Sequence, residues 1–257
     1  MAPENSDTSE NNSAGVAGSG GFIDGNVFGL GATASAFGVD ALRDVTAEEQ
    51  AARRAAEAVR RLIVALSTTS ASIEELGLIA QSVDAIVDTV PAGEPDELTV
   101  AGDFSVISAT AIRQSHRLRE RSPFIGMANP VAPPMHVTFT EEVIEATVTL
   151  GVLYEGPPGC VHGGFVAAMF DEVLGAAQVY SGKAGMTGRL TVHYRSPTPL
   201  DQELHLVARL VRVEGRKILC TATLHAGDRL CADAEGLFVT IDLEKVRAML
   251  EAAGESE

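Results

Sequence analysis

A stretch rich in glycine and proline, followed by an apolar segment that contains an acid, constrains this chain most. It reads Glu155-Gly156-Pro157-Pro158-Gly159-Cys160-Val161-His162-Gly163-Gly164, and Asp171 follows in an apolar run. Glycine lets a ligand approach the backbone, and the N–H groups of Gly163 and Gly164 lie at the positive end of a predicted helix. A carboxylate on an apolar helix is either paired, or desolvated and able to act as a base. The pattern therefore predicts an anion-stabilising helix start and an acid that is either paired or reactive.

The spacing of Gly163 and Asp171 limits how they can act together. On one helix they are about 12 Å apart along the axis, at about 1.5 Å per residue. A reacting carbonyl lies about 3 Å from its oxyanion donors, with the base in direct reach or one water away. Two copies of the helix in a twofold dimer would supply one group each. The spacing therefore predicts a homodimer with shared sites, and leaves a tetramer open.

Three later motifs extend this pattern. They are Gly185-Met186-Thr187-Gly188-Arg189-Leu190-Thr191-Val192-His193-Tyr194-Arg195-Ser196-Pro197-Thr198-Pro199-Leu200, Val213-Glu214-Gly215-Arg216-Lys217 and Ala234-Glu235-Gly236-Leu237-Phe238. Together with His162-Gly163-Gly164 and Asp171, they resemble the signature of hotdog-fold acyl-CoA thioesterases of the phenylacetate-degradation (PaaI-like) and 4-hydroxybenzoyl-CoA thioesterase type. The resemblance covers roughly residues 122–242. The Glu-Gly-Pro-Pro-Gly run is most similar to the branch that contains mammalian long-chain acyl-CoA thioesterases.

The resemblance implies a role for each matched residue. Gly163 supplies an oxyanion-hole N–H, Asp171 acts as base or nucleophile, and Thr187 positions the water or the acid. CoA is then part of the substrate, and no separate cofactor is expected. Many relatives carry Asn or Gln where this chain has Gly156. His162 and Asn129 are the candidates to replace that second contact to the thioester carbonyl.

Further candidate substrate contacts follow the main motif. Gly164 lies beside Gly163, and Arg189, His193 and Arg195 share one face of a predicted strand. One or more of these three is predicted to bind CoA phosphates; the alternative is a solvated outer face. No metal is predicted, because the histidines show no helical i, i+4 pairing and have no cysteine partners.

The composition excludes several classes of protein. The chain has 35 acidic and 19 basic residues, a formal net charge of −16, which argues against nucleic-acid binding. No apolar run approaches the length of about 18 residues that a membrane span needs. Three cysteines without metal-like spacing indicate free thiols in a reducing compartment. With no signal-peptide pattern at the N-terminus, these features predict a cytoplasmic location.

Composition divides the 257 residues into five segments. We expect a disordered low-complexity tail at 1–44, a helical hairpin at 45–92, a linker at 93–122, a hotdog domain at 123–242, and a short helix and tail at 243–257. In the hairpin, capping boxes begin at Thr46 and Ser72 and precede apolar residues at helical spacing. We expect the hairpin to pack on the main domain or a partner subunit; a membrane-surface or regulatory role is the alternative.

The hotdog segment shows one helical and several strand patterns. An apolar helix is predicted at about 163–180, ended by Gly182, Gly185 and Gly188. Period-two alternation and turn residues predict strands at 136–139, 143–150, 190–194, 203–213, 217–225 and 229–241. A long antiparallel sheet with one apolar helix indicates an α+β hotdog architecture with an N-terminal helical extension. Exposed sheet edges again favour a dimer.

These patterns together predict hydrolysis of a fatty or aromatic acyl-CoA thioester. A non-catalytic, acyl-CoA-binding regulatory protein of the same fold is the first alternative, favoured by Gly156 and by the long N-terminal extension. A hydratase or dehydratase on this fold is disfavoured, because the chain shows no matching Asp/His pattern. Acyl length and the choice between CoA and a carrier protein remain open at this point.

Overall fold

The computed structural model describes residues 45–91, 120–133, 135–183 and 185–240. The tail expected at 1–44, most of the linker expected at 93–122, and the helix expected at 243–257 lie outside the described residues. Among the helices that are described, none combines the length and apolar character needed to cross a membrane.

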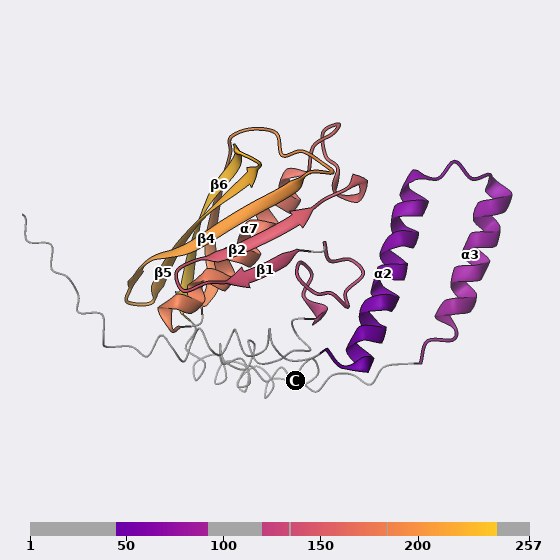
Figure 1. Cartoon of the computed structure of the whole chain (residues 1–257), viewed down its shortest axis with the longest axis horizontal. Coiled ribbons are helices and arrows are strands. Elements are labelled where there is room, and N and C mark those ends of the chain that lie inside the picture. The colour runs from indigo at the N-terminus through magenta and orange to yellow at the C-terminus, as the bar shows by residue number, and fades with distance from the viewer. Residues whose placement is uncertain (1–44, 92–119, 134, 184, 241–257) are drawn as a thin grey trace, which may run out of the picture. The chain divides into compact units, whose positions relative to one another are not determined.

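Six antiparallel strands form one sheet in the order β1-β2-β4-β5-β6-β3 (Figure 1). The strands differ in length, from the short edge strand β1 to the long central hairpins. Their bounds are β1 His136–Phe139, β2 Ile144–Thr149, β3 Gly185–Tyr194, β4 Glu203–Glu214, β5 Lys217–Ala226 and β6 Arg229–Thr240. Strands β1 and β3 are the two edges, so each is paired on one side only.

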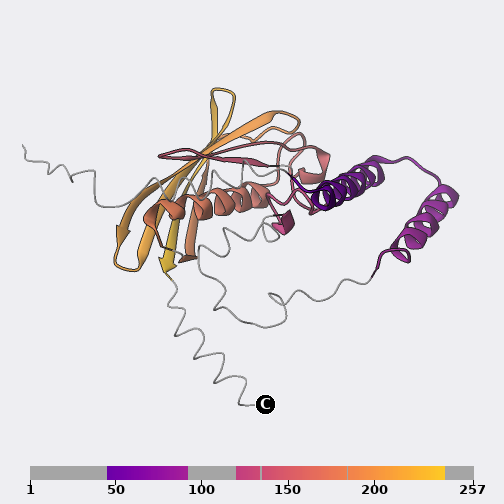
Figure 2. The ribbon, with the colours of Figure 1, turned by 60° about the horizontal axis from the view of Figure 1, so that its bottom comes forward.

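Helix α7 (Gly163–Ala177) lies across one face of this sheet (Figure 2). Its apolar side chains are fully buried at Met169, Phe170 and Val173. Alternate residues of the strands turn inward to meet it, as at Leu204 and Leu206 of β4. The predicted hotdog architecture, a sheet packed around one central helix, is confirmed.

The start of β3 differs from the expectation. The strand begins at Gly185, whereas the glycines at 185 and 188 were interpreted as helix breakers ahead of a strand at 190. A Cβ at Gly185 would lie 3.0 Å from the Val239 carbonyl oxygen of β6. A register shift also falls between Thr187 and Arg189. These glycines therefore mark close approach to a neighbouring strand and a bulge rather than a loop.

The end of the central helix also differs in detail. Helix α7 stops at Ala177, and a 3-10 turn, η3 (Gln178–Ser181), carries the chain to Gly182. Gly182 has a φ of 68°, a left-handed conformation that favours glycine. Gly182 thus ends the helical segment as predicted.

Two helices precede the sheet, α2 (Ala47–Thr68) and α3 (Ile73–Val87). Both predicted capping boxes form, with Thr46 and Ser72 as N-caps. Most of their larger apolar residues are exposed, as at Val59, Leu66 and Ile73. Ala56 is the buried residue of α2, and α3 has no buried residue in the described structure. Helix α2 contacts the main domain through Arg53 and Arg60, and packing of the hairpin on a partner subunit stays a prediction.

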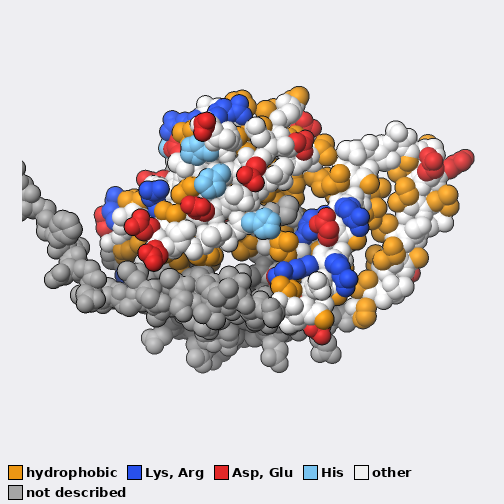
Figure 3. Space-filling model, viewed as in Figure 1, with side chains coloured by type: hydrophobic (Ala, Val, Ile, Leu, Met, Phe, Trp, Pro, Cys, Tyr) orange, Lys and Arg blue, Asp and Glu red, His pale blue; other side chains and the backbone are white. Residues whose placement is uncertain are grey.

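The sheet face opposite α7 is polar. Charged and histidine side chains gather on it, as Figure 3 shows. His205 and Glu145 lie 3.8 Å apart there, on β4 and β2. Among the described residues, no group of three or more His, Cys, Asp or Glu side chains is arranged to hold a metal ion.

Candidate active site

A tight turn places the start of α7. The chain passes through a 3-10 turn, η2 (Val152–Tyr154), and the glycine-proline run before it enters the helix. Gly156 N–H donates to the Cys160 carbonyl at 2.9 Å, and Gly159 has a φ of 72°. His162 N–H then donates to the Tyr154 carbonyl at 2.8 Å. These bonds fix His162 as the N-cap of α7.

The first backbone N–H groups of α7 have hydrogen-bond acceptors, with one exception. His162 Nδ1 accepts from the Gly164 N–H at 3.0 Å, and the His162 carbonyl accepts from Phe165 N–H at 2.9 Å. The first amides of a helix have no acceptor within the helix. In the part of the chain that the structure describes, the Gly163 N–H has no acceptor at all. This amide is therefore available for an anion, and the Gly164 amide is not.

The same contact assigns the tautomer of His162. Because Nδ1 accepts a hydrogen bond, the neutral imidazole carries its proton on Nε2. The side chain is exposed, so this second N–H is free to donate to a ligand. His162 thus combines a structural cap with a polar group beside the Gly163 amide.

Asp171 lies on the same helix and is paired with Thr187. The Thr187 hydroxyl donates to Asp171 Oδ1 at 2.9 Å, from β3 to α7. Both side chains are exposed in the single chain. Of the two states open to an acid on an apolar helix, the structure shows the paired one. The contact orients the carboxylate and leaves Oδ2 open to another group.

The more buried acid of α7 is the next residue. Burial raises the pKa of Glu172, the Ser122 hydroxyl at 3.4 Å from Oε1 lowers it, and the nearby charge of Asp171 raises it further. A raised carboxyl pKa can mark a functional site, but it also follows from structural burial. Because Glu172 faces the loop at Ser122, we assign it to packing.

Gly163 and Asp171 do not meet within one chain. Both lie on α7, which is helical from Gly163 to Ala177. Their separation along the axis is therefore the one expected from the sequence, about 12 Å. One chain thus presents two half-sites, a free amide at the helix start and a paired acid two turns later.

The two candidates for the missing Asn or Gln differ in the structure. A Cβ at Gly156 would lie 2.8 Å from the Cα of His162, so the backbone excludes a side chain at this position. The Asn129 amide donates to the carbonyls of Arg121 and Ser122 at 3.1 and 3.2 Å. Its hydrogens are therefore used within its own loop. His162 remains as the available donor.

The basic residues of β3 are paired across the strands with acids of β6. Arg189 contacts Glu235 at 3.3 Å, His193 Nδ1 lies 3.0 Å from Asp233 Oδ2, and Arg195 also hydrogen-bonds to Asp233. The Arg195 guanidinium lowers the pKa of the Asp233 carboxyl, with a smaller contribution from His193. These exposed basic side chains of β3 are therefore neutralised by the acids of β6, and they do not need a ligand to balance their charge.

Tyr194 and Tyr154 are contacts that the motif analysis missed. The Tyr194 hydroxyl donates to the Gly163 carbonyl at 2.8 Å, and a Cβ at Gly163 would lie 3.4 Å from the Tyr194 ring. Period-two alternation along β3 places Tyr194 opposite Arg189, His193 and Arg195, on the side of α7. The alternation along β3 alone therefore could have predicted that Tyr194 faces α7. Tyr154 acts through its backbone, which residue type alone does not reveal.

The fold defines a class of protein, the hotdog thioesterases, and comparison with known proteins agrees. The family model described as "Thioesterase superfamily" matches residues 158–232. A crystal structure of a thioesterase superfamily protein is 34% identical and has a TM-score of 0.62. That match covers 76% of this chain and 92% of the other. The chain belongs to the thioesterase superfamily.

Curated relatives match over the same region. Acyl-coenzyme A thioesterase THEM4 of Xenopus laevis is 38% identical over 93 residues, which are 35% of this chain and 42% of the relative. THEM4 of Mus musculus is 34% identical over 115 residues, covering 43% of this chain and 50% of the relative. The chain therefore spans about half the length of these relatives or less.

Proposed function

We propose that this protein hydrolyses acyl-CoA thioesters to the free acid and CoA. The observation that carries the proposal is the Asp171 carboxylate, held by the Thr187 hydroxyl at 2.9 Å in a thioesterase superfamily domain. Relatives named acyl-coenzyme A thioesterases support CoA as the thiol part of the substrate. A fatty or an aromatic acyl group is the expected acid part, and no further cofactor takes part.

In the proposed reaction, the Gly163 N–H binds the thioester carbonyl oxygen. That amide has no acceptor among the described residues and lies at the positive end of α7. The Nε2–H of His162 adds a second donor, in place of the side chain that Gly156 lacks. Both donors act most strongly as negative charge develops on this oxygen.

Asp171 then activates the nucleophile. Acting as a base, it takes a proton from water while the water oxygen attacks the carbonyl carbon. The carbon–sulfur bond breaks, and the proton passes to the departing CoA thiolate. Direct attack by the carboxylate would use the same Thr187 contact, break the carbon–sulfur bond and give a mixed anhydride. Water then hydrolyses the anhydride, and one of its protons passes to the released CoA thiolate.

The two half-sites require a second copy of the chain. Strand β3 carries Thr187 and has one unpaired edge. Joining two such edges about a twofold axis would cover an exposed edge and bring each Asp171 toward its partner's α7. We propose a homodimer in which Gly163 of one chain and Asp171 of the other serve one substrate.

The test is the release of free thiol from short-chain, long-chain and aromatic acyl-CoAs. The variant Asp171→Asn should lose at least about 100-fold in kcat, the usual magnitude for a general base. Glu172→Gln is the matched control: the neighbouring acid becomes an amide of the same shape that can still accept from Ser122. It should keep the activity of the parent within about twofold.

A non-catalytic acyl-CoA-binding function is the second candidate. The backbone at Gly156 favours it, because it excludes the polarising side chain found in many relatives. Acyl-CoA binding without turnover of any thioester by the parent protein would establish this candidate. Turnover that survives in Asp171→Asn would instead show that another group is the base.

A further inference from the structure

Helix α2 meets the main domain through one face built on arginines. Arg53, Ala56 and Arg60 are spaced by three and four residues, so they share a side of the helix. Ala56 is 5% exposed, and its lack of side-chain length lets the backbone come close. The flanking guanidinium groups reach past it to the domain. This arrangement differs from an apolar contact, because its geometry is set by directional bonds.

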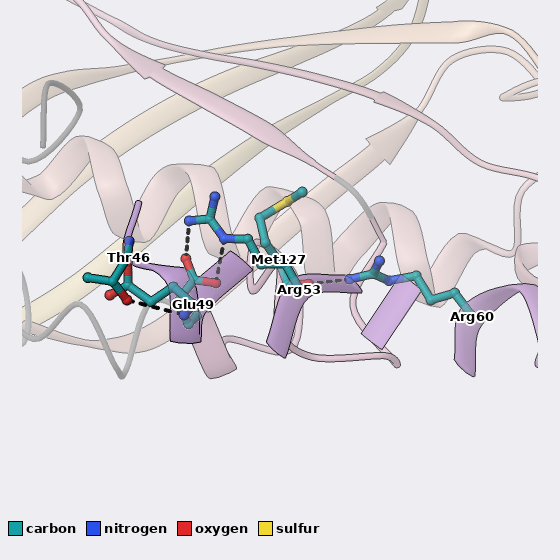
Figure 4. Close-up of polar contacts among 6 residues, drawn as sticks. Thr46, Glu49, Arg53, Arg60 and Met127 are labelled. Carbon is teal, nitrogen blue, oxygen red and sulfur yellow. Dashed lines mark hydrogen bonds and ion pairs between the residues drawn. The ribbon is translucent and has the colours of Figure 1, made fainter. Parts of the chain in front are cut away.

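Arg60 makes the most extensive of these contacts. Its Nη2 donates to the Met127 carbonyl at 2.7 Å (Figure 4). The same Nη2 donates to the Asn129 carbonyl at 3.2 Å, and Nη1 donates to Glu57 at 2.6 Å. The side chain is 11% exposed. Its Nε is buried and has no hydrogen-bond partner among the described residues. A planar group held on two carbonyls in this way cannot be replaced by lysine without loss of contacts.

The loop that Arg60 holds is rigidly built. A Cβ at Gly126 would lie 2.5 Å from two carbonyl oxygens, those of Glu120 and Ser122. The Asn129 amide donates to the carbonyls of Arg121 and Ser122 in the same loop. The loop also contacts α7, through the Ser122 hydroxyl and Glu172. Because the loop has little freedom to deform, a displacement of residues 127–129 should also move the neighbouring α7.

Helix α2, which carries Arg60, packs against η2, the turn that contains Tyr154. Burial raises the pKa of the Tyr154 hydroxyl, and the positive charge of Arg60 lowers it. The Tyr154 carbonyl accepts from the His162 N–H at 2.8 Å, and the Tyr154 ring packs edge-on against Phe165 at 5.0 Å. Residue Tyr154 thus connects the α2 contact to the N-terminus of α7.

We propose that Arg60 is a positioning residue for the half-site at Gly163. By holding the 127–129 turn on α2, which packs against η2, it fixes the N-terminus of α7 and so the direction of the Gly163 amide. The catalytic consequence rests on the proposed hydrolysis; the structural link does not. The extension at 45–92 then acts on the site through α2.

The experiment compares Arg60→Met and Arg60→Lys with the matched control Arg61→Met. Arg61 is the next residue of α2, is exposed, and has no polar partner in the described part of the chain. Arg60→Met should lower kcat by about tenfold, since misplacement of a catalytic group by about 1 Å can cost up to 100-fold. Arg60→Lys should lie between parent and Arg60→Met, and Arg61→Met should match the parent.

Binding of a non-hydrolysable ligand distinguishes a misplaced Gly163 amide from general damage to the binding site. An acyl-CoA thioether lacks the carbonyl oxygen, so its binding does not depend on the Gly163 amide. Its Kd should stay within about twofold in Arg60→Met, measured well below the melting temperature of each variant. Equal losses in thioether binding and kcat would overturn the positioning role, as would an unchanged kcat.

Hydrogen exchange supplies a readout that needs no substrate. Amides of residues 152–166 should exchange faster in Arg60→Met than in the parent or in Arg61→Met, while those of β4 and β5 stay unchanged. Unchanged exchange at 152–166 would overturn the proposal. If the parent turns over no thioester, the proposed function fails, and the exchange result still decides the role of Arg60.

Discussion

One backbone N–H group distinguishes the start of α7. The neighbouring amides are bound by Tyr154, by the His162 side chain and by the His162 carbonyl, whereas the Gly163 amide has no acceptor among the described residues. Proline is also well suited to position N1 of a helix, because the N–H there has no acceptor within the helix. The amide can therefore be removed without breaking the helix.

Gly163→Pro should abolish the oxyanion contact. His162 has φ −60° and ψ 130°, an extended conformation that suits the residue before proline. We expect kcat to fall by about 100-fold or more, as for removal of one oxyanion donor, with little change in melting temperature. Thiol release and a thermal melt measure the two effects.

Gly163→Ala is the control for this substitution. It keeps the N–H, and its Cβ would lie 3.4 Å from the Tyr194 ring, an ordinary contact. Activity near that of the parent is expected. A loss equal to that of the proline variant would assign the effect to the side chain rather than to the amide.

Glu172 makes the stability of the fold depend on pH. Its pKa is raised by burial, so the folded state disfavours the charged form. This acid stabilises the folded state most at low pH, and stability is lost as the pH rises through the carboxyl range. Glu172→Gln should therefore unfold at higher denaturant concentration than the parent at pH 7, with the advantage shrinking below about pH 4. An equal difference at both pH values would contradict this account.

At the scale of elements, the packing of α7 on β6 depends on Gly236. A Cβ there would lie 2.9 Å from the Phe238 ring and 3.2 Å from Leu174 of α7. Both side chains are buried, so neither can move away freely. Gly236→Ala should lower the free energy of unfolding by about 1–3 kcal/mol, the usual range for overpacking.

Gly175 of α7 offers a glycine-to-alanine substitution with the opposite expected effect on the free energy of unfolding. A Cβ at this position meets nothing within 4 Å. Gly175→Ala should raise the free energy of unfolding by about 0.5–1 kcal/mol, because alanine restricts the unfolded chain and favours the helix. Denaturant titrations of both variants compare the signs directly. A loss in Gly175→Ala would indicate a neighbour outside the single chain.

Local signals predicted the elements well. The capping boxes at Thr46 and Ser72 and the end of the helical segment at Gly182 were read from residue types whose hydrogen bonds or backbone angles are local. The start of β3 was missed, because Gly185 and Gly188 are explained by the closeness of β6. Strand β6 lies far from these glycines in the sequence, so residue type alone does not reveal that the two strands are neighbours.

At the scale of the whole molecule, the proposed shared site predicts complementation between chains. Gly163→Pro and Asp171→Asn each damage one half-site, so neither homodimer has an intact site. In mixed dimers one of the two sites combines intact halves. Equal mixing should therefore restore about a quarter of the parent activity, since about half of the dimers are mixed.

The measurement is thiol release after the two inactive variants are unfolded together and refolded. Refolding each variant alone supplies the background. Activity that stays at this background would show that Gly163 and Asp171 of the same chain serve one substrate, and would remove the reason for a shared site.

The sequence by itself determined the fold class and the position of α7, and it predicted the residues of the candidate site. These follow from periodicity, helix caps and a motif whose residues lie within a short stretch of chain. Tertiary structure alone decided that Thr187 holds Asp171 and that Arg60 reaches the turn at Met127. Such contacts join residues far apart in sequence, and their directions depend on how the elements pack.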